Sequence, residues 1–325
     1  MAERHPELLG PEQTPLSGAS YVHVLRGEGY AWWRSVGGVL LALSLYPLLT
    51  PAVAGLVLRI GYLVSTRADS WPVYLTEARR FGLPIGMLAA NLALVGLIPL
   101  AGALVWVVHR VRPRWLSSVT PGIRWRYLLV CTAIGLVVLS AVAVLPAVLS
   151  GNLAWAPQPQ LVAFLAVIVI TTPVQAAAEE YLFRGYLLQA FGSLSVTRWA
   201  GVGLSALLFA GFHGSQNLPL FVDRLAFGLA AGALVVLTGG LEAGIGAHVA
   251  NNLIAYTVAA LTSSIADIRA VRALTWPDAL QDVGGFVLVA GVALAVARWR
   301  GLSTTTPTTR PAQRSRGTTA RRRIS

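Results

Sequence analysis

The sequence predicts an all-α, polytopic transmembrane helical bundle of about eight spanning helices. Of its 325 residues, 55% are hydrophobic and only 12% are charged, about half the charged fraction of a typical soluble domain. The apolar residues come in runs close to or above the roughly 20 residues that a spanning helix needs. One of these runs, residues 176–189, nevertheless contains two carboxylates and an arginine.

Eight apolar runs are expected to cross the membrane. They lie near residues 37–64, 84–108, 127–149, 161–190, 199–215, 218–238, 241–261 and 283–299. The fifth run is short. The fourth carries the two carboxylates, and Pro173 is expected to kink its helix two turns before the first of them.

These runs divide the chain into five segments. In order, we expect a polar cytoplasmic leader at 1–35, N-terminal transmembrane helices at 36–150, a core bearing the polar residues at 160–260, a last loop and transmembrane helix at 261–300, and a disordered Arg-rich cytoplasmic tail at 301–325. The leader lacks the basic start and short apolar core of a signal peptide, so we expect it to be loosely ordered.

The placement of arginine predicts the orientation. The loop between the second and third runs holds five arginines, whereas the loop between the third and fourth holds no charge. Because positive loops stay in the cytoplasm, both termini should lie there. The basic tail should contact membrane lipids with anionic headgroups rather than nucleic acid. The lysine-free composition suggests a bacterial cytoplasmic membrane.

Helix geometry separates the roles of the two adjacent glutamates. Glu180 and Arg184 are four residues apart on one helix face, so they can form an ion pair that neutralises both charges within the bilayer. Glu179 points about 100° away and has no arginine at that spacing. Because a charged group in hydrocarbon is costly and usually functional, we interpret the ion pair as structural and Glu179 as the functional carboxylate.

Two histidines and an asparagine are the other polar candidates in apolar helices. His213 follows Phe209 by four residues and His248 precedes Asn252 by four, so each pair shares a helix face. Glu179 and the two histidines could converge on one water molecule, with the glutamate as general base. They could instead hold a divalent metal such as zinc, for which Glu and two His is a known ligand set. Asn252, with a histidine, could donate to the oxyanion of an attacked amide.

Each of these residues also has a structural interpretation. A buried histidine can donate to a backbone carbonyl without any catalytic role, and polar side chains often link transmembrane helices. The single cysteine, Cys131, excludes a disulfide within the chain and a zinc site built from thiolates. The residues by themselves leave the metal-free and metal-assisted alternatives open.

In their order along the chain, these residues match three motifs of a known family. EExxxR runs from Glu179 to Arg184, FxxxH from Phe209 to His213, and HxxxN from His248 to Asn252. With these motifs on successive apolar helices, residues 160–260 resemble the CAAX protease and bacteriocin-processing family of intramembrane endopeptidases, also described through its abortive-infection-like domain.

The resemblance implies an α-helical membrane protease whose catalytic core is residues 160–260. Glu179 would activate the attacking water and His213 would help to bind it. His248 and Asn252 would form the oxyanion hole. Members of the family are described as metalloproteases, but a glutamate mechanism without metal is also argued for them, so the need for a metal cofactor stays open.

We therefore expect an endopeptidase that hydrolyses a peptide bond of a peptide or membrane-protein substrate in or near the bilayer. An alternative from another class is a non-catalytic bacteriocin-immunity or scaffold protein that binds a peptide in the same place. A transporter is a third alternative, because buried Glu and His also relay protons. The sequence, however, lacks the repeat signature that many transporters show. We expect no nucleic-acid partner.

Overall fold

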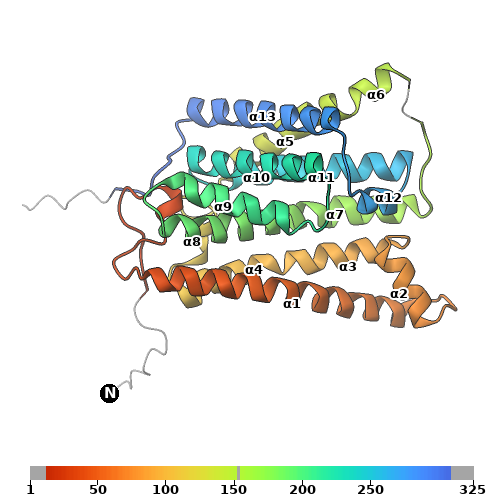
Figure 1. The fold of residues 1–325 in the computed structure, drawn as a ribbon, viewed down its shortest axis with the longest axis horizontal. Coiled ribbons are helices and arrows are strands. Elements are labelled where there is room, and N and C mark those ends of the chain that lie inside the picture. Colours follow the sequence, from red (N-terminus) through yellow and green to blue (C-terminus); the bar gives the residue numbers. More distant parts are fainter. Residues whose placement is uncertain (1–11, 152–153, 309–325) are drawn as a thin grey trace, which may run out of the picture.

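The computed structural model describes residues 12–151 and 154–308. Throughout these ranges the regular secondary structure is helical, with only isolated β-bridges besides. The long helices run side by side along the longest axis of the molecule (Figure 1). The predicted all-α bundle is therefore confirmed.

The N-terminal half builds three long helical units. After the short 3₁₀ segment η1 (Tyr21–His23), the first unit is α1 (Trp32–Val64), followed by the short α2 (Trp71–Arg79). The second unit consists of α3 (Pro84–Val95), α4 (Leu97–Ala103) and the π-helical η2 (Leu104–Val108). After the 3₁₀ segment η3 (Pro113–Leu116), the third unit consists of α5 (Trp125–Ala143) and α6 (Leu145–Leu149). Proline in the first turn starts α2 and α3, where its missing N–H costs no hydrogen bond.

The C-terminal half begins with one continuous helix that changes its winding. It comprises α7 (Leu161–Glu180), the π-helical η4 (Tyr181–Leu187) and α8 (Leu188–Ser193), and it is followed by α9 (Arg198–Gly211), α10 (Leu218–Thr238), α11 (Glu242–Thr262), α12 (Ile265–Ala270) and α13 (Trp276–Trp299). The N-termini of α10, α12 and α13 are capped by the side chains of Asn217, Ser264 and Thr275. Each accepts a hydrogen bond from a backbone N–H group that has no partner within the first helical turn.

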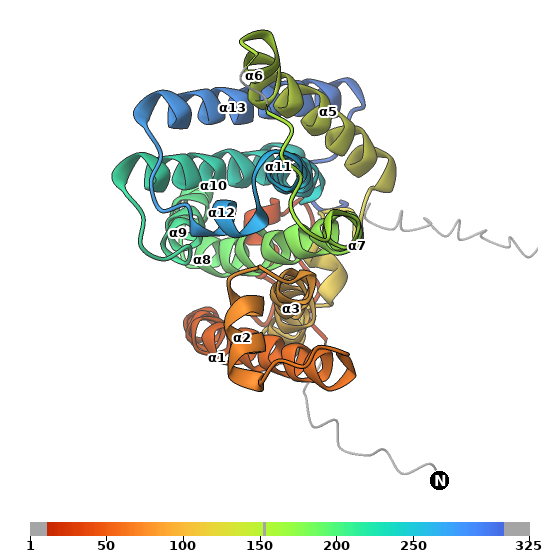
Figure 2. The same cartoon turned by 90° about the vertical axis from the view of Figure 1, so that its right-hand side faces the viewer.

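Viewed along the bundle, α11 is surrounded by other helices (Figure 2). It packs against α5, α7 and α10, while α1 and α3 form one edge of the bundle and α5 and α13 form the opposite edge. α7 joins the two parts, because it packs against both α3 and α11. The candidate polar residues of α7 and α11 are therefore held at a helix–helix contact inside the bundle.

Within the described residues, six helical units are long and apolar enough to cross a membrane. They are Trp32–Val64, Pro84–Val108, Trp125–Leu149, Leu161–Ser193, Leu218–Thr238 and Trp276–Trp299. The other two predicted spans are also helices but do not meet these criteria. α9 has only 14 residues. α11 has 21 but includes Glu242, His248 and two asparagines, which a helix can carry when other helices shield it from lipid.

The outer helices expose large apolar side chains, as a lipid-facing surface requires. Val162, Val169 and Ile170 on α7 are 65% or more exposed, and Leu129 and Val137 on α5 are similarly exposed. Apolar patches on this scale mark a surface that another apolar phase covers. The protein is therefore a multi-pass membrane protein.

The polar leader is packed against the bundle wherever the structure describes it. Tyr21 and Val22 are fully buried, and Arg26 donates to the carbonyl of Ser193 at 2.8 Å. The expectation of a loosely ordered leader was therefore wrong for residues 12–35, because their apolar side chains cover the end of α8. Residues 1–11 lie outside the described ranges.

The start of the predicted tail is also ordered. The backbone N–H of Thr306 donates to the carbonyl of Ala19 at 2.9 Å, and Thr306 is buried. Residues 301–308 are thus tied to the N-terminal segment, against the expectation of disorder, while residues 309–325 lie outside the described ranges. Both described chain ends lie at one end of the bundle (Figure 1), as an even number of spans requires.

Small residues let α11 approach α5 closely. A Cβ atom added to Gly246 would stand 2.7 Å from the backbone nitrogen of Thr132 and 2.8 Å from the carbonyl carbon of Cys131. A Cβ added to Gly135 on α5 would stand 2.7 Å from the Cβ of Ala250. Because backbone cannot move aside cheaply, these glycines set the helix spacing.

We expect Gly246→Ala to lower the free energy of unfolding by about 1–3 kcal/mol through overpacking at the α5–α11 contact. Thermal unfolding of the purified protein in detergent checks this. Gly291→Ala on α13 is the matched control, because its Cβ would meet no atom within 4 Å. Equal unfolding temperatures for the two variants would show that α11 does not need this close approach.

Candidate active site

The candidate site is built where α7 and α11 cross as antiparallel neighbours. Glu179 on α7 faces His248 on α11, and Gln175, one turn earlier on α7, faces Asn252, one turn later on α11. The two helices therefore run in opposite directions through this contact. The two pairs form successive steps of one interhelical contact.

The ion pair expected from spacing is formed. Arg184 Nη1 lies 2.8 Å from Glu180 Oε1, and both side chains are fully buried. The guanidinium also lies over the ring of Phe209, 4.0 Å from its centroid, and 5.4 Å from that of Phe227. Aromatic faces attract a desolvated cation, so Arg184 is held by one carboxylate and two rings.

Close packing holds Glu180 on its other side. A Cβ added to Gly244 of α11 would stand 3.0 Å from Glu180 Oε2, so the carboxylate occupies space that only glycine leaves free. Glu180 is the last residue of α7, and the π-helical turn begins with the next residue. Such wide turns are rare and are found mostly at functional sites.

His248 lies between the two carboxylates. Its Nδ1 is 2.9 Å from Glu180 Oε1 and its Nε2 is 3.3 Å from Glu179 Oε2. Each ring nitrogen of His248 therefore faces a carboxylate oxygen. No partner for His248 is evident from the sequence, because Glu180 lies 68 residues away on another helix.

Glu179 differs from Glu180 in its surroundings. Its side chain retains 12% accessibility, while that of Glu180 retains none. Glu179 contacts His248, whereas the neighbouring Arg184 is engaged by Glu180. The structure therefore leaves one carboxylate of the pair able to meet a water molecule or a substrate.

His213 stands just beyond the end of α9. Its Nδ1–H donates to the carbonyl of Phe209 at 2.7 Å, and its ring lies edge-on to that of Phe209 with centroids 4.6 Å apart. In the described part of the chain its Nε2 has no hydrogen-bond partner. Arg224 holds this loop by donating to the side chain of Gln216 at 2.7 Å.

Asn252 has a fixed amide orientation. Its Nδ2 donates to Gln175 Oε1 at 3.2 Å, and its Oδ1 accepts from Asn251 Nδ2 at 3.1 Å. The amide nitrogen carries two hydrogens, so one stays available to a further acceptor. Gln175 was not singled out from the sequence. The sequence feature that could have identified it is its position in an apolar helix, four residues before Glu179 and so on the same helix face.

The three suggested zinc ligands do not come together as a metal-binding set. Among the described residues no three His, Cys, Asp or Glu side chains form a group that could hold a metal ion. Both nitrogens of His248 already contact carboxylates, so its ring has no nitrogen left for a metal. Because Glu179, His213 and His248 do not fit a metal in this arrangement, no chemical step is assigned to one.

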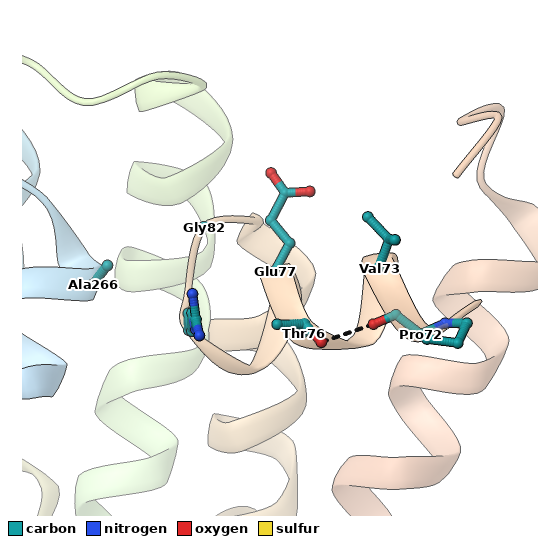
Figure 3. A pocket seen from close by; sticks show the side chains of 7 residues that line it. Pro72, Val73, Thr76, Glu77, Gly82 and Ala266 are labelled. Carbon is teal, nitrogen blue, oxygen red and sulfur yellow. Dashed lines mark hydrogen bonds between the residues drawn. The ribbon is translucent and has the colours of Figure 1, made fainter. Parts of the chain in front are cut away.

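A surface hollow of about 600 Å³ lies elsewhere, between α2 and α12 (Figure 3). It is lined by Pro72, Val73, Thr76, Glu77, Arg80, Gly82 and Ala266. None of the candidate site residues lines it. Glu77 on its wall is engaged by Arg67 at 2.8 Å, so this hollow contributes nothing to the chemistry of the Glu179 site.

Comparisons with known proteins identify the segment that carries the site. Residues 159–254 match the family model described as "Type II CAAX prenyl endopeptidase Rce1-like", so this part of the chain is similar to that family and the resemblance carried by the motifs is confirmed there. A protein of Bacillus subtilis (strain 168), printed as "Uncharacterized protein YyaK", is 38% identical over 96 residues. That match covers 27% of this chain and 32% of the relative. No solved structure matches.

We expect Arg184→Ala to destabilise the protein by about 3–5 kcal/mol, because it leaves Glu180 as an uncompensated buried charge. The double variant Glu180→Gln with Arg184→Ala should recover part of this loss. Thermal unfolding in detergent measures both. Arg198→Ala, at an exposed position, is the control and should stay within about 0.5 kcal/mol of the native protein. No rescue in the double variant would contradict the ion-pair assignment.

Proposed function

We propose that this protein is an intramembrane endopeptidase that hydrolyses a peptide bond in or near the bilayer, with Glu179 activating the attacking water. The observation that carries the proposal is the division of labour between two adjacent carboxylates. Glu180 is fully buried and paired with Arg184, while Glu179 keeps 12% side-chain accessibility beside His248. The Rce1-like match over residues 159–254 supports the same reaction class.

In the proposed reaction Glu179 takes a proton from water, and the hydroxide attacks the carbonyl carbon of the scissile amide. His213 holds that water through Nε2, since its Nδ1–H is fixed on the Phe209 carbonyl. The protonated Glu179 then delivers its proton to the leaving nitrogen as the C–N bond breaks. General acid–base catalysis of this kind contributes roughly 10²–10⁴-fold to a rate.

The developing oxyanion needs hydrogen-bond donors that are already in place. We assign the oxyanion to the second hydrogen on Asn252 Nδ2 and to Nε2 of His248, which stands 3.3 Å from Glu179 Oε2. Anchoring by Gln175 and Asn251 keeps the Asn252 amide from turning its oxygen toward the oxyanion. A prepositioned donor costs no reorganisation during the reaction, and removing one typically costs about 10²–10³ in kcat.

The proposed substrate is a peptide or a membrane protein, and lipids are the other neighbours. The family description names prenyl endopeptidases. The match to the Bacillus subtilis relative, however, covers less than a third of this chain and of the relative. Only the peptide bond is therefore carried over to the proposal. Because the candidate site lies within apolar helices, we propose that the scissile bond lies in the membrane or is drawn into it.

We propose that both chain ends face the cytoplasm of a bacterial cell. Arginines gather at the end of the bundle where the described chain ends lie, with Arg34 near the start of α1, Arg126 at the start of α5 and Arg298 near the end of α13. At the opposite end Arg67 is neutralised by Asp69 at 2.6 Å and by Glu77 at 2.8 Å. Positive charge near span ends marks the cytoplasmic side.

The catalytic proposal predicts that Glu179→Gln abolishes the appearance of specific new peptide termini. Cells lacking the protein would be complemented with the native chain, with Glu179→Gln or with the exposed control Glu28→Gln, at matched membrane levels. Mass spectrometry of peptide termini then compares the strains. We expect termini that appear with the native chain and the control but not with Glu179→Gln, whose side chain keeps its shape and loses its basicity.

Two other outcomes would redirect the proposal. Identical termini in all strains, together with rescue of a cellular phenotype by Glu179→Gln, would favour the non-catalytic immunity or scaffold function. Termini that persist with Glu179→Gln but disappear with His213→Gln would show that a residue other than Glu179 is the general base. The same purified variants should unfold within a few degrees of the native protein, which excludes misfolding as the cause of a loss.

The orientation predicts opposite labelling of two introduced cysteines. Thr120 and Ser70 are exposed at opposite ends of the bundle, and the native Cys131 is fully buried. In spheroplasts a membrane-impermeant maleimide should label Ser70→Cys but label Thr120→Cys only after lysis. The reverse pattern would place both described chain ends outside the cytoplasm.

A further inference from the structure

A glutamine outside the three motifs lies between the two halves of the candidate site. Gln175 is 4% exposed on α7 and stands one helical turn before Glu179. Its Oε1 accepts from Asn252 Nδ2 at 3.2 Å, and Glu179 follows it by four residues, so the two side chains share one face of α7. One amide therefore lies beside the proposed base and contacts the proposed oxyanion donor.

The hydrogen-bond network fixes which end of this amide faces which partner. Asn251 Nδ2 donates to Asn252 Oδ1, so Asn252 must present its nitrogen to Gln175. A donating nitrogen requires an acceptor, which makes the oxygen of Gln175 the end that faces Asn252. The Nε2 group of Gln175 is then the end that faces Glu179, where its hydrogens meet an acceptor-only carboxylate.

We propose that Gln175 is a positioning residue that aligns the Glu179 carboxylate with the Asn252 amide across the α7–α11 contact. This inference rests on the proposed function. Gln175 touches neither water nor substrate in this role. It acts by orienting Glu179 through a donated hydrogen bond and by orienting Asn252 through an accepted one, so that base and oxyanion donor keep a fixed relative placement.

The alternative role is structural adhesion between helices. Polar contacts of that kind occur elsewhere on α7, where Asn91 of α3 donates to Thr171 at 2.7 Å without touching any candidate site residue. A contact that only holds helices together should affect stability when it is removed. A positioning contact should also affect the catalytic step and the reactivity of the Glu179 carboxylate.

The same long helix offers a matched control. Gln189 on α8 is fully buried, and its Nε2 donates to the carbonyl of Trp115 at 3.1 Å. Among the described residues, no hydrogen bond joins it to a candidate site residue. Gln175→Leu and Gln189→Leu are therefore the same substitution at two buried positions of the Leu161–Ser193 helix, one inside the site and one outside it.

The first test measures kinetics on a quenched fluorescent peptide that spans the strongest Glu179-dependent terminus found in cells. We expect Gln175→Leu to lower kcat by about 10–100-fold, less than the loss of a direct oxyanion donor, while KM changes less than about threefold. Gln189→Leu should keep kcat within about twofold of the native enzyme, whatever its unfolding temperature. Glu179→Gln provides the blank.

The second test needs no substrate. Dicyclohexylcarbodiimide modifies protonated carboxyl groups in apolar surroundings, and mass spectrometry can follow its addition to Glu179 at pH 7 in nanodiscs. A hydrogen bond donated to a carboxylate favours its ionised form. We therefore expect Gln175→Leu to speed the modification of Glu179 by about tenfold. Gln189→Leu should not change it, and Glu180 should stay unmodified because it is fully buried.

The two tests separate failure of this inference from failure of the proposed function. Unchanged kcat and unchanged modification in Gln175→Leu would overturn the positioning role while leaving the protease intact. Equal losses of kcat in both leucine variants, in proportion to their lowered unfolding temperatures, would show that Gln175 serves only to hold the helices together. If no Glu179-dependent cleavage exists, the endopeptidase proposal fails, and the modification rate still decides whether Gln175 orients Glu179.

Discussion

Charge neutrality inside an apolar bundle is the constraint on which the site depends. An isolated buried charge costs several kcal/mol, and this structure buries four ionisable side chains together. Glu180 contacts both Arg184 and His248 directly, and His248 extends the cluster to Glu179. Phe209 and Phe227 cover the guanidinium. The cluster therefore places one accessible carboxylate in the membrane beside two basic side chains that also contact the second carboxylate.

α11 makes this arrangement geometrically possible. Its first half is buried on all sides and is rich in small residues, so it approaches α5 and α7 closely enough to bring His248 between the two glutamates. A second buried ion pair anchors its start, where Glu242 accepts from the backbone N–H and the Nε–H of Arg124, each at 2.9 Å. Because the surrounding helices shield it from lipid, α11 can carry polar residues inside the bundle.

The proposed catalytic groups lie on elements of different rigidity. Glu179, Gln175, His248 and Asn252 stand on two long helices that contact each other over successive turns, whereas His213 follows the end of α9 and is held through its loop. Sites built on helices keep their geometry better than sites on loops. Base and oxyanion donors are thus fixed relative to one another, and the residue proposed to hold water has the greater freedom to adjust as a substrate enters.

The sequence by itself determined the fold class, the positions of the long helices, the Glu180–Arg184 pair and the set of candidate residues. All of these depend on composition or on spacing within one helix, which sequence displays directly. The tertiary structure decided the rest. Only the crossing of α7 and α11 shows that His248 bridges both glutamates and that Gln175 meets Asn252. Only packing shows that residues 12–35 cover α8 instead of staying loose, since contacts between residues far apart in the chain leave no periodic pattern in the sequence.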